Sequence, residues 1–293
     1  MQTSARLERT LSAAIDAHVS TDSPPRLVAA IRHAVFPGGA RVRPRLCTAV
    51  ARACEGDDPD LAAAAAAAIE LLHCASLVHD DLPCFDDGPF RRGHPSVHRA
   101  FGERLAILAG DALIVLAFQT IAQAGGRSPQ RVAPLLKTVA AGAGLPAGMA
   151  AGQAWECEPQ VALRDYHRAK TGALFAAATQ AGALASGTDP APWKALGDRL
   201  GEAYQVADDI RDACGSAQWL GKPAHRDAAL ARPTIAAELG LAAAMPLFDR
   251  LMAETERAVP PGRGAAALRE LIRAEAARLI PRALADELLL SAA

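Results

Sequence analysis

The sequence predicts an all-α protein. Aromatic residues make up only 4% of its 293 residues, and alanine, leucine and arginine dominate the composition. Stretches that alternate β-branched with polar residues are nearly absent, whereas helix-type patterns recur along the chain. No internal repeat, low-complexity linker or shift in composition divides the chain. We therefore expect a single domain over residues 1–293, folded as a helical bundle.

Breaker residues bound the expected helices. An amphipathic helix over 3–19 ends at the breakers of 20–25, and a second helix runs to about Val35. The main helix begins near Asp60 and runs to Asp81 without Gly or Pro, and its alanine run has the highest helix propensity available. The remaining expected helices cover 41–54, 101–124, 129–143, 146–158, 163–186, 190–212, 234–257 and 263–279.

Charge and composition exclude several classes of protein. The formal net charge of −1 gives no reason to expect binding to nucleic acid or to an anionic membrane surface. The six cysteines form no Cys-x-x-Cys pair, which indicates reduced core or near-core thiols of a cytoplasmic protein. The first nine residues carry charges where a signal peptide would need an apolar run. No stretch is expected to span a membrane, since the best candidate, 61–80, contains Glu70, His73 and His79.

Four carboxylates lie within eight residues at and just beyond the end of the main helix: Asp80, Asp81, Asp86 and Asp87. Two carboxylates about 5 Å apart repel by roughly 3 kcal/mol at an effective dielectric near 20, so such a cluster favours a bound cation. Oxygen-only donors indicate Mg²⁺ more than Zn²⁺, and Mg²⁺ commonly accompanies phosphate. Arg91 and Arg92 come next and provide planar forks that suit phosphate oxygens. The alternative is a solvated acidic turn with a basic neighbour.

A second acidic cluster ends the helix expected over 190–212. Asp208 and Asp212 are four residues apart, so both carboxylates project from one face, with Asp209 beside them and Gln205 one turn earlier. Two such clusters about 130 residues apart favour one compact bundle that brings them together. A weaker phosphate signal is the loop Gly38-Gly39 with Arg41 and Arg43 just beyond it, for which a helix-entry turn is the alternative.

These motifs resemble those of the trans-isoprenyl diphosphate synthases, the polyprenyl synthetase family, over nearly the whole chain. Asp80, Asp81 and Asp86 match its first aspartate-rich motif, followed by Arg91-Arg92-Gly93, and Asp208, Asp209 and Asp212 match its second. Further matches in the right order are His73, Gln153, Lys170-Thr171-Gly172, Gln205 and Lys222. Variants such as Gly-Gln-Ala-Trp-Glu are similar to those of geranylgeranyl diphosphate synthases in bacterial pigment pathways, which indicates carotenoid biosynthesis.

The resemblance implies an isoprenoid synthase fold with a central cavity, usually as a homodimer. The implied reaction is the head-to-tail condensation of isopentenyl diphosphate with an allylic diphosphate (dimethylallyl, geranyl or farnesyl). It also implies three Mg²⁺ ions, replaceable by Mn²⁺, held by Asp80, Asp81, Asp86, Asp208 and Asp212. Arg43, His73 and Arg92 match positions that hold isopentenyl diphosphate. The family positions that hold the allylic leaving group or face the developing cation are matched by Arg91, Lys170, Thr171, Gln205 and Lys222. A further lysine of the family in this set is replaced here by Arg232.

The resemblance further implies a C20 product, geranylgeranyl diphosphate. Relatives that make the C15 product typically carry an aromatic residue at the position of Ala75, which together with Ser76 and Leu72 is expected to set the chain length. Ala40 departs from the family, which usually has lysine there, so one contact to isopentenyl diphosphate is missing. Glu156 stands where aspartate is common, and Tyr204 where phenylalanine is common.

Other interpretations predict other functions. A farnesyl diphosphate synthase would stop at C15, and a non-catalytic regulatory homologue would explain Ala40. A class I terpene cyclase would not need the second Asp-Asp-x-x-Asp motif, and a metal-dependent HD phosphohydrolase, suggested by His79-Asp80, would need further histidines.

Overall fold

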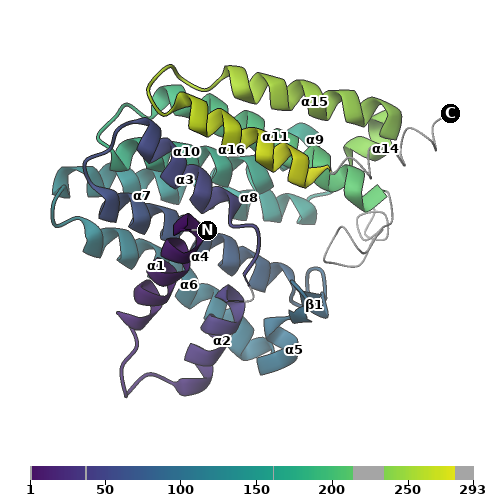
Figure 1. Cartoon of the computed structure of the whole chain (residues 1–293). Helices are drawn as coiled ribbons and strands as arrows, with labels where there is room; N and C mark the ends of the chain where they lie inside the picture. The colour runs from purple at the N-terminus through teal and green to yellow at the C-terminus, as the bar shows by residue number, and fades with distance from the viewer. Residues whose placement is uncertain (1, 37, 161, 214–233, 281–293) are drawn as a thin grey trace. The chain divides into compact units, whose positions relative to one another are not determined.

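The computed structural model describes the chain except for residues 1, 37, 161, 214–233 and 281–293 (Figure 1). Two units make up the chain, one formed by Met1–Val139 with Ala181–Thr188 and the other by Ala140–Gln180 with Asp189–Ala293. Helices form nearly all the regular structure of the described residues, which confirms the all-α prediction. The single-domain expectation stays a prediction.

In the first unit, two helices begin where the sequence supplies a proline or a cap. Pro25 occupies the first turn of α2 (Pro25–Val35), and the side chain of Asp58 accepts a hydrogen bond from the backbone N–H of Leu61 (3.1 Å) at the start of α4 (Pro59–Asp80). The other elements are α1 (Gln2–Asp16), α3 (Val42–Ala53), β1 (Phe90–Arg91), β2 (His94–Pro95), α5 (Val97–Phe101), α6 (Glu103–Ala124) and α7 (Pro129–Ala143), whose last four residues belong to the second unit.

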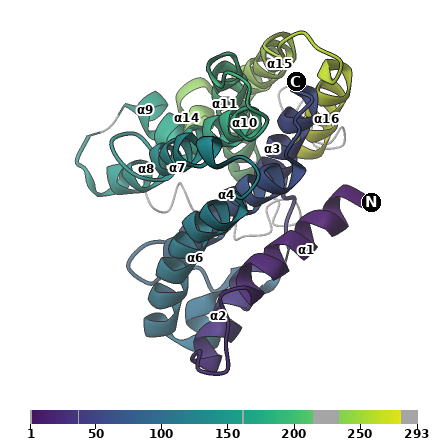
Figure 2. The ribbon, with the colours of Figure 1, turned by 90° about the vertical axis from the view of Figure 1, so that its left-hand side faces the viewer.

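Helix α4 forms the core of the first unit. Its alanines at 64–68 are at most 5% exposed, and α1, α3 and α6 all pack against it. Figure 2 shows α6 running alongside α4, an approach that the small alanine side chains permit. The buried alanine run therefore fixes the position of the helix that ends at Asp80.

The expectation that no segment is apolar enough to span a membrane is wrong by length and composition. Both α4 and α6 pass that test, with mean hydropathies of 1.8 and 2.0 over 18 residues. In α4, 78% of this window is buried inside the protein, so its apolar character is that of a core helix. In α6 only 44% of the window is buried.

The second unit is built around α11 (Ala191–Ala213). This helix packs against η2 (Arg168–Gly172), α14 (Ile235–Leu239), α15 (Leu241–Arg257) and α16 (Ala265–Leu279). The unit also contains α8 (Met149–Ala154), η1 (Trp155–Cys157), α9 (Leu163–His167) and most of α10 (Ala173–Ala185).

The structure divides several helices that were expected to be continuous. A π-helical turn, η2, interrupts the helix expected over 163–186, and Gly240 (φ 76°) separates α14 from α15 within 234–257. The helix expected over 101–124 is broken at Gly102, and the helix expected over 146–158 is shorter and consists of α8 and η1. The helix expected over 3–19 ends at Asp16. The β1–β2 hairpin was not expected; it pairs only two residues on each strand.

The five described cysteines are all free thiols. Cys47 and Cys74 are buried, as expected, and burial raises the pKa of Cys47 to about 12 and that of Cys74 to about 11. Cys84 and Cys157, by contrast, are exposed.

Candidate active site

The acidic turn of the first unit folds back on the end of α4. The backbone N–H of Asp86 donates to the carbonyl oxygen of Asp80 (2.9 Å), and that of Gly88 donates to the carbonyl oxygen of Asp81 (3.2 Å). Asp87 is held separately, since its carboxylate accepts a hydrogen bond from Arg99 (3.0 Å). These backbone hydrogen bonds keep Asp86, a predicted metal ligand, beside Asp80 and Asp81 at the end of the helix.

Arg91, on β1, pairs with this cluster. Its Nε lies 3.2 and 3.1 Å from the two carboxylate oxygens of Asp81, and its Nη2 lies 3.8 Å from Asp80 Oδ2. Burial raises the pKa of Asp81, Arg91 opposes that rise, and the charge of Asp86 adds to it. Arg91 therefore supplies part of the positive charge that these carboxylates require, a role beyond the diphosphate contact expected from the resemblance.

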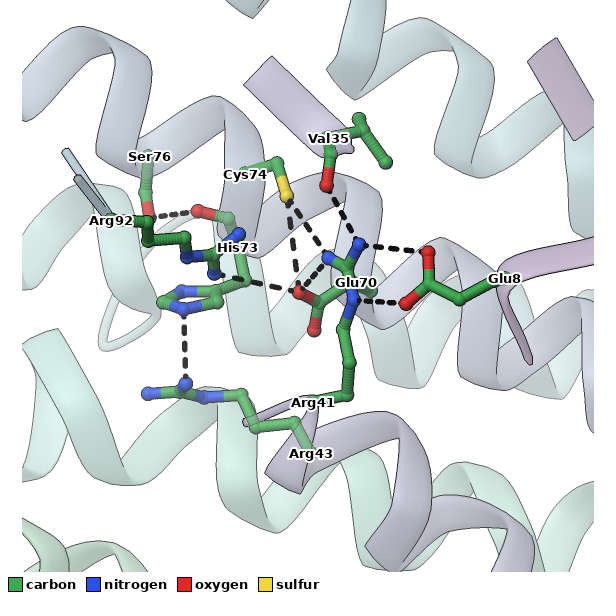
Figure 3. A network of polar contacts seen from close by, with 9 residues as sticks. All are labelled: Glu8, Val35, Arg41, Arg43, Glu70, His73, Cys74, Ser76 and Arg92. Atoms are coloured by element: carbon green, nitrogen blue, oxygen red, sulfur yellow. Dashed lines mark hydrogen bonds and ion pairs between the residues drawn. The ribbon is translucent and has the colours of Figure 1, made fainter. Parts of the chain in front are cut away.

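A second group in this unit brings together Arg43, His73 and Arg92 (Figure 3). Arg43 Nη1 lies 3.4 Å from His73 Nε2. Burial, with the charges of Arg43 and Arg92, lowers the pKa of His73 well below its ordinary value of 6.5, so the imidazole is neutral at pH 7. Because a guanidinium can only donate, Nε2 of His73 accepts. Two fixed positive charges beside a neutral imidazole suit a diphosphate.

The three residues expected to set chain length lie along α4. Leu72 and Ala75 are each 1% exposed, and the hydroxyl of Ser76 donates to the carbonyl oxygen of His73 (2.8 Å). Ser76 is therefore tied to the backbone of the residue that precedes it by one turn. The role of these residues in setting product length stays a prediction.

In the second unit, Glu156 holds Lys170. The carboxylate of Glu156 pairs with the Lys170 ammonium and accepts hydrogen bonds from Tyr166 Oη (2.6 Å) and Gln153 Nε2 (3.0 Å). The ammonium also lies 5.7 Å from the centre of the Tyr166 ring. Sequence reasoning treated Glu156 only as a departure from aspartate and missed this role. The signal that could have found it is that Gln153, Glu156 and Lys170 lie close together in a stretch rich in family motifs.

Thr171 and the second acidic cluster form a continuous hydrogen-bonded chain. Thr171 Oγ1 donates to Gln205 Oε1 (2.7 Å), and Gln205 Nε2 donates to Asp209 Oδ1 (2.8 Å). The other oxygen of Asp209 accepts from the backbone N–H of Ile235 (2.8 Å), at the start of α14. Asp209 therefore serves as a buried support, consistent with its absence from the predicted metal ligands.

Asp208 and Asp212 share the face of α11 that the four-residue spacing predicts. Asp208 accepts a hydrogen bond from Arg211 Nη2 (2.9 Å), and Asp212 is 5% exposed. Nearby, burial and the charge of Lys170 lower the pKa of His167 to about 4, although Asp208 opposes the shift. Among the described residues, Lys170 and Arg211 therefore supply positive charge near this cluster at neutral pH, whereas His167 does not.

Two glycines allow the π-turn that carries Lys170 and Thr171 to sit close to its neighbours. A Cβ added to Gly152, on α8, would lie 2.3 Å from the Cα of Lys170. One added to Gly201, on α11, would lie 2.6 Å from the Cα of Gly172. Only glycine permits backbones to approach this closely, and this approach brings Thr171 within reach of Gln205.

A sequence profile described as Polyprenyl synthetase matches residues 24–257. The chain belongs to the polyprenyl synthetase family. It is 50% identical to a geranylgeranyl diphosphate synthase of Cereibacter sphaeroides, covering 94% of this chain and 96% of that protein. A geranylgeranyl diphosphate synthase of Rhodobacter capsulatus is 45% identical, covering 94% and 95%.

Solved structures agree with this assignment. The geranyltransferase of Helicobacter pylori complexed with magnesium and isoprenyl diphosphate superposes with a TM-score of 0.80 at 32% identity, covering 92% of this chain and 93% of that one. Membership of the polyprenyl synthetase family confirms the predictions of the isoprenoid synthase fold and of an enzyme, a prenyltransferase.

The carboxylates of this polyprenyl synthetase fit a hard cation. Both acidic clusters offer oxygen donors, which Mg²⁺ prefers. Among the residues that the structure describes, no group of three or more His, Cys, Asp and Glu side chains is arranged to hold a metal ion. Mg²⁺ is commonly held by one or two carboxylates while water and substrate phosphates complete its shell.

Most predicted site residues fall into these groups, and two lie outside them. Lys222 and Arg232 belong to 214–233, outside the described residues. Sequence reasoning missed Glu8 and Glu70 and noted Arg41 only as a neighbour of Arg43. Glu70 did carry a signal, because it is a lone acid among the apolar residues of the main helix, where a charge must be paired if it is buried.

Proposed function

We propose that this chain is a Mg²⁺-dependent trans-prenyltransferase that condenses isopentenyl diphosphate with allylic diphosphates, head to tail, to give geranylgeranyl diphosphate (C20). The observation that carries the proposal is that two acidic clusters each lie beside basic side chains, in a chain 50% identical to a geranylgeranyl diphosphate synthase. Its acceptable primers are dimethylallyl, geranyl and farnesyl diphosphate, and the pathway served is carotenoid biosynthesis.

The basic groups divide between the two substrates. Isopentenyl diphosphate binds to Arg43, Arg92 and neutral His73. The guanidinium forks of the two arginines match phosphate oxygens. Lys170, released from Glu156 toward substrate, binds the allylic diphosphate with Arg91, Lys222 and Arg232. Asp80, Asp81, Asp86, Asp208 and Asp212 would hold three Mg²⁺ ions, replaceable by Mn²⁺, which when bound stabilise the charge on the departing diphosphate.

The reaction needs a cation to survive until it is captured. The bond from C1 of the allylic substrate to its diphosphate breaks, and C4 of isopentenyl diphosphate then forms a bond to C1. The oxygens of Thr171 and Gln205 direct dipoles at the developing cation, and apolar helix surfaces exclude water that would quench it. Loss of one proton to the departing diphosphate restores a double bond.

We also infer that the enzyme is a soluble, cytoplasmic homodimer that binds no nucleic acid. Four large apolar side chains on one face of α6 are exposed by 37–56%: Ile107, Leu108, Ile114 and Val115. Exposed apolar side chains grouped on one helix face are typical of an interface, and a second copy of the chain is the occupant consistent with the predicted homodimer. This face also accounts for the incompletely buried hydropathic window of α6.

Metal dependence and two substitutions test the proposal. With radiolabelled isopentenyl diphosphate and farnesyl diphosphate, the purified protein should form acid-labile product only when Mg²⁺ is present. Asp80→Ala and Asp208→Ala should remain folded by circular dichroism but lose activity by orders of magnitude. Asp87→Asn is the matched control. This variant should retain activity, because Asp87 pairs with Arg99.

Two outcomes would contradict the proposal. Near-wild-type activity of both aspartate variants, with unchanged metal dependence, would refute the assigned mechanism. A folded wild-type protein that extends no primer would favour the regulatory homologue instead.

A further inference from the structure

A network of buried charged side chains links α1, α4, the residue before α3 and the β1–β2 hairpin within the first unit (Figure 3). Its centre is the pair Arg41 and Glu70, whose side chains are only 3% and 2% exposed. Arg41 Nη1 donates to Glu70 Oε1 at 2.6 Å. Buried charges are costly unless their partners are well placed, so this pair is expected to constrain whatever it contacts.

Arg41 uses its whole guanidinium inside the protein. Its Nε and Nη2 donate to the two carboxylate oxygens of Glu8 (2.9 and 3.2 Å), and Nη2 also donates to the carbonyl oxygen of Val35 (2.7 Å). Nη1 contacts Cys74 Sγ (3.9 Å) besides Glu70. Burial by itself would lower the pKa of Arg41, but Glu8 and Glu70 outweigh it and raise that pKa. Arg41 is therefore a permanently charged internal support, with no donor left for a ligand.

Arg92 is placed differently by the same network. Its Nη2 lies 3.7 Å from Glu70 Oε1, the oxygen that also accepts from Arg41. Its Nη1 is buried and has no hydrogen-bond partner among the described residues. A buried donor without a partner is costly, which is explained if a ligand supplies the acceptor.

The backbone conformations of Arg41 and Arg92 also indicate that neighbouring contacts hold these residues in place. Arg41 and Arg92 both adopt left-handed backbone conformations, with φ of 49° and 54°. Such a conformation is unfavourable for a residue with a side chain, and it persists only where surrounding contacts demand it. The carboxylate of Glu70 is a charged contact that both residues share, and both also interact with Cys74.

We propose that Arg41 and Glu70 are positioning residues for isopentenyl diphosphate: Arg41 fixes the Glu70 carboxylate, and Glu70 holds the Arg92 guanidinium so that its Nη1 is available to the diphosphate. Glu8 extends this support to α1, which makes the N-terminal helix part of the substrate site. The inference rests on the proposed function, which assigns isopentenyl diphosphate to Arg43, His73 and Arg92.

Conservative substitutions with separate Michaelis constants test this role. Glu70→Gln keeps the shape of the side chain but removes its charge. Arg41→Lys keeps a charge, but one compact ammonium cannot serve two carboxylates and a carbonyl together. Each should raise the KM for isopentenyl diphosphate about tenfold, which corresponds to about 1.4 kcal/mol, and leave the KM for farnesyl diphosphate within about twofold. Arg52→Lys, exposed on α3, is the matched control and should change neither constant.

The pattern of constants separates the outcomes. A fall in kcat with both KM values unchanged, or an equal change in both, would mean that the network only stabilises the fold and would overturn the proposal. If Glu70→Gln does not fold, Glu8→Gln carries the test, since the Glu8 side chain is 37% exposed, and it should raise the same KM by a smaller factor.

A further variant distinguishes this inference from the proposed function. Arg92→Lys should raise the KM for isopentenyl diphosphate by at least as much as Glu70→Gln. If Arg92→Lys has no such effect, the assigned substrate site is wrong. If Arg92→Lys has the effect but Glu70→Gln and Arg41→Lys do not, the site stands and the positioning role is refuted.

Discussion

Gly201→Ala should slow catalysis while leaving the protein folded. The added Cβ would lie 2.6 Å from the Cα of Gly172, whereas carbon atoms pack best at about 3.5–4.0 Å, so α11 and the π-turn must separate by about 1 Å. The Thr171 Oγ1 to Gln205 Oε1 distance of 2.7 Å would then approach about 3.7 Å, beyond hydrogen-bonding range. Misplacement by about 1 Å can cost about 100-fold in rate, so we expect kcat to fall by about that factor.

Stability should change much less than rate. Overpacking costs about 1–3 kcal/mol, and replacing glycine by alanine within a helix returns about 1 kcal/mol. Thermal unfolding by circular dichroism should therefore show a folded protein with a slightly lower Tm, alongside steady-state kinetics with both substrates. Gly126→Ala is the control, because its Cβ would meet nothing within 4 Å. Thr171→Val, which replaces the hydroxyl with a methyl group of similar size, should also lower kcat. Wild-type kinetics for Gly201→Ala would refute the reasoning.

Three further substitutions test other parts of the account. Ala40→Lys, at an exposed position beside Arg41, should lower the KM for isopentenyl diphosphate about tenfold and leave the allylic KM unchanged. The size of the effect follows because a charge-assisted contact is worth about 1.5–3 kcal/mol at most. An equal effect on both substrates would count against the site assignment. Ala75→Tyr should shift the main product from C20 to C15, as chromatography of the dephosphorylated products would show; continued C20 synthesis would mean that Ala75 does not set the length. Leu108→Arg, on the exposed face of α6, should convert the dimer to a monomer in sedimentation analysis, and an unchanged dimer would place the interface elsewhere.

The acidic clusters and the helices that carry them were predictable because their signals are local. The uninterrupted alanine run fixed α4 and hence Asp80, and the four-residue spacing placed Asp208 and Asp212 on one face of α11. The π-turn at Arg168–Gly172 could not be predicted, because it depends on backbone approaches by Gly152 and Gly201, which are distant in sequence. The same holds for Arg41: whether it binds a phosphate or the two carboxylates of Glu8 and Glu70 depends on how α1 packs beside α4.

The length of the product tests the central claim most directly. Burying one more five-carbon unit favours the longer chain by about 4 kcal/mol, at roughly 0.8 kcal/mol per carbon group, so the small side chain of Ala75 should permit synthesis to C20. The purified protein should be incubated with Mg²⁺, radiolabelled isopentenyl diphosphate and, separately, dimethylallyl, geranyl and farnesyl diphosphate, and the products sized. All three primers should converge on geranylgeranyl diphosphate. Accumulation of the C15 product with farnesyl diphosphate left unextended, or no extension of any primer, would contradict the account.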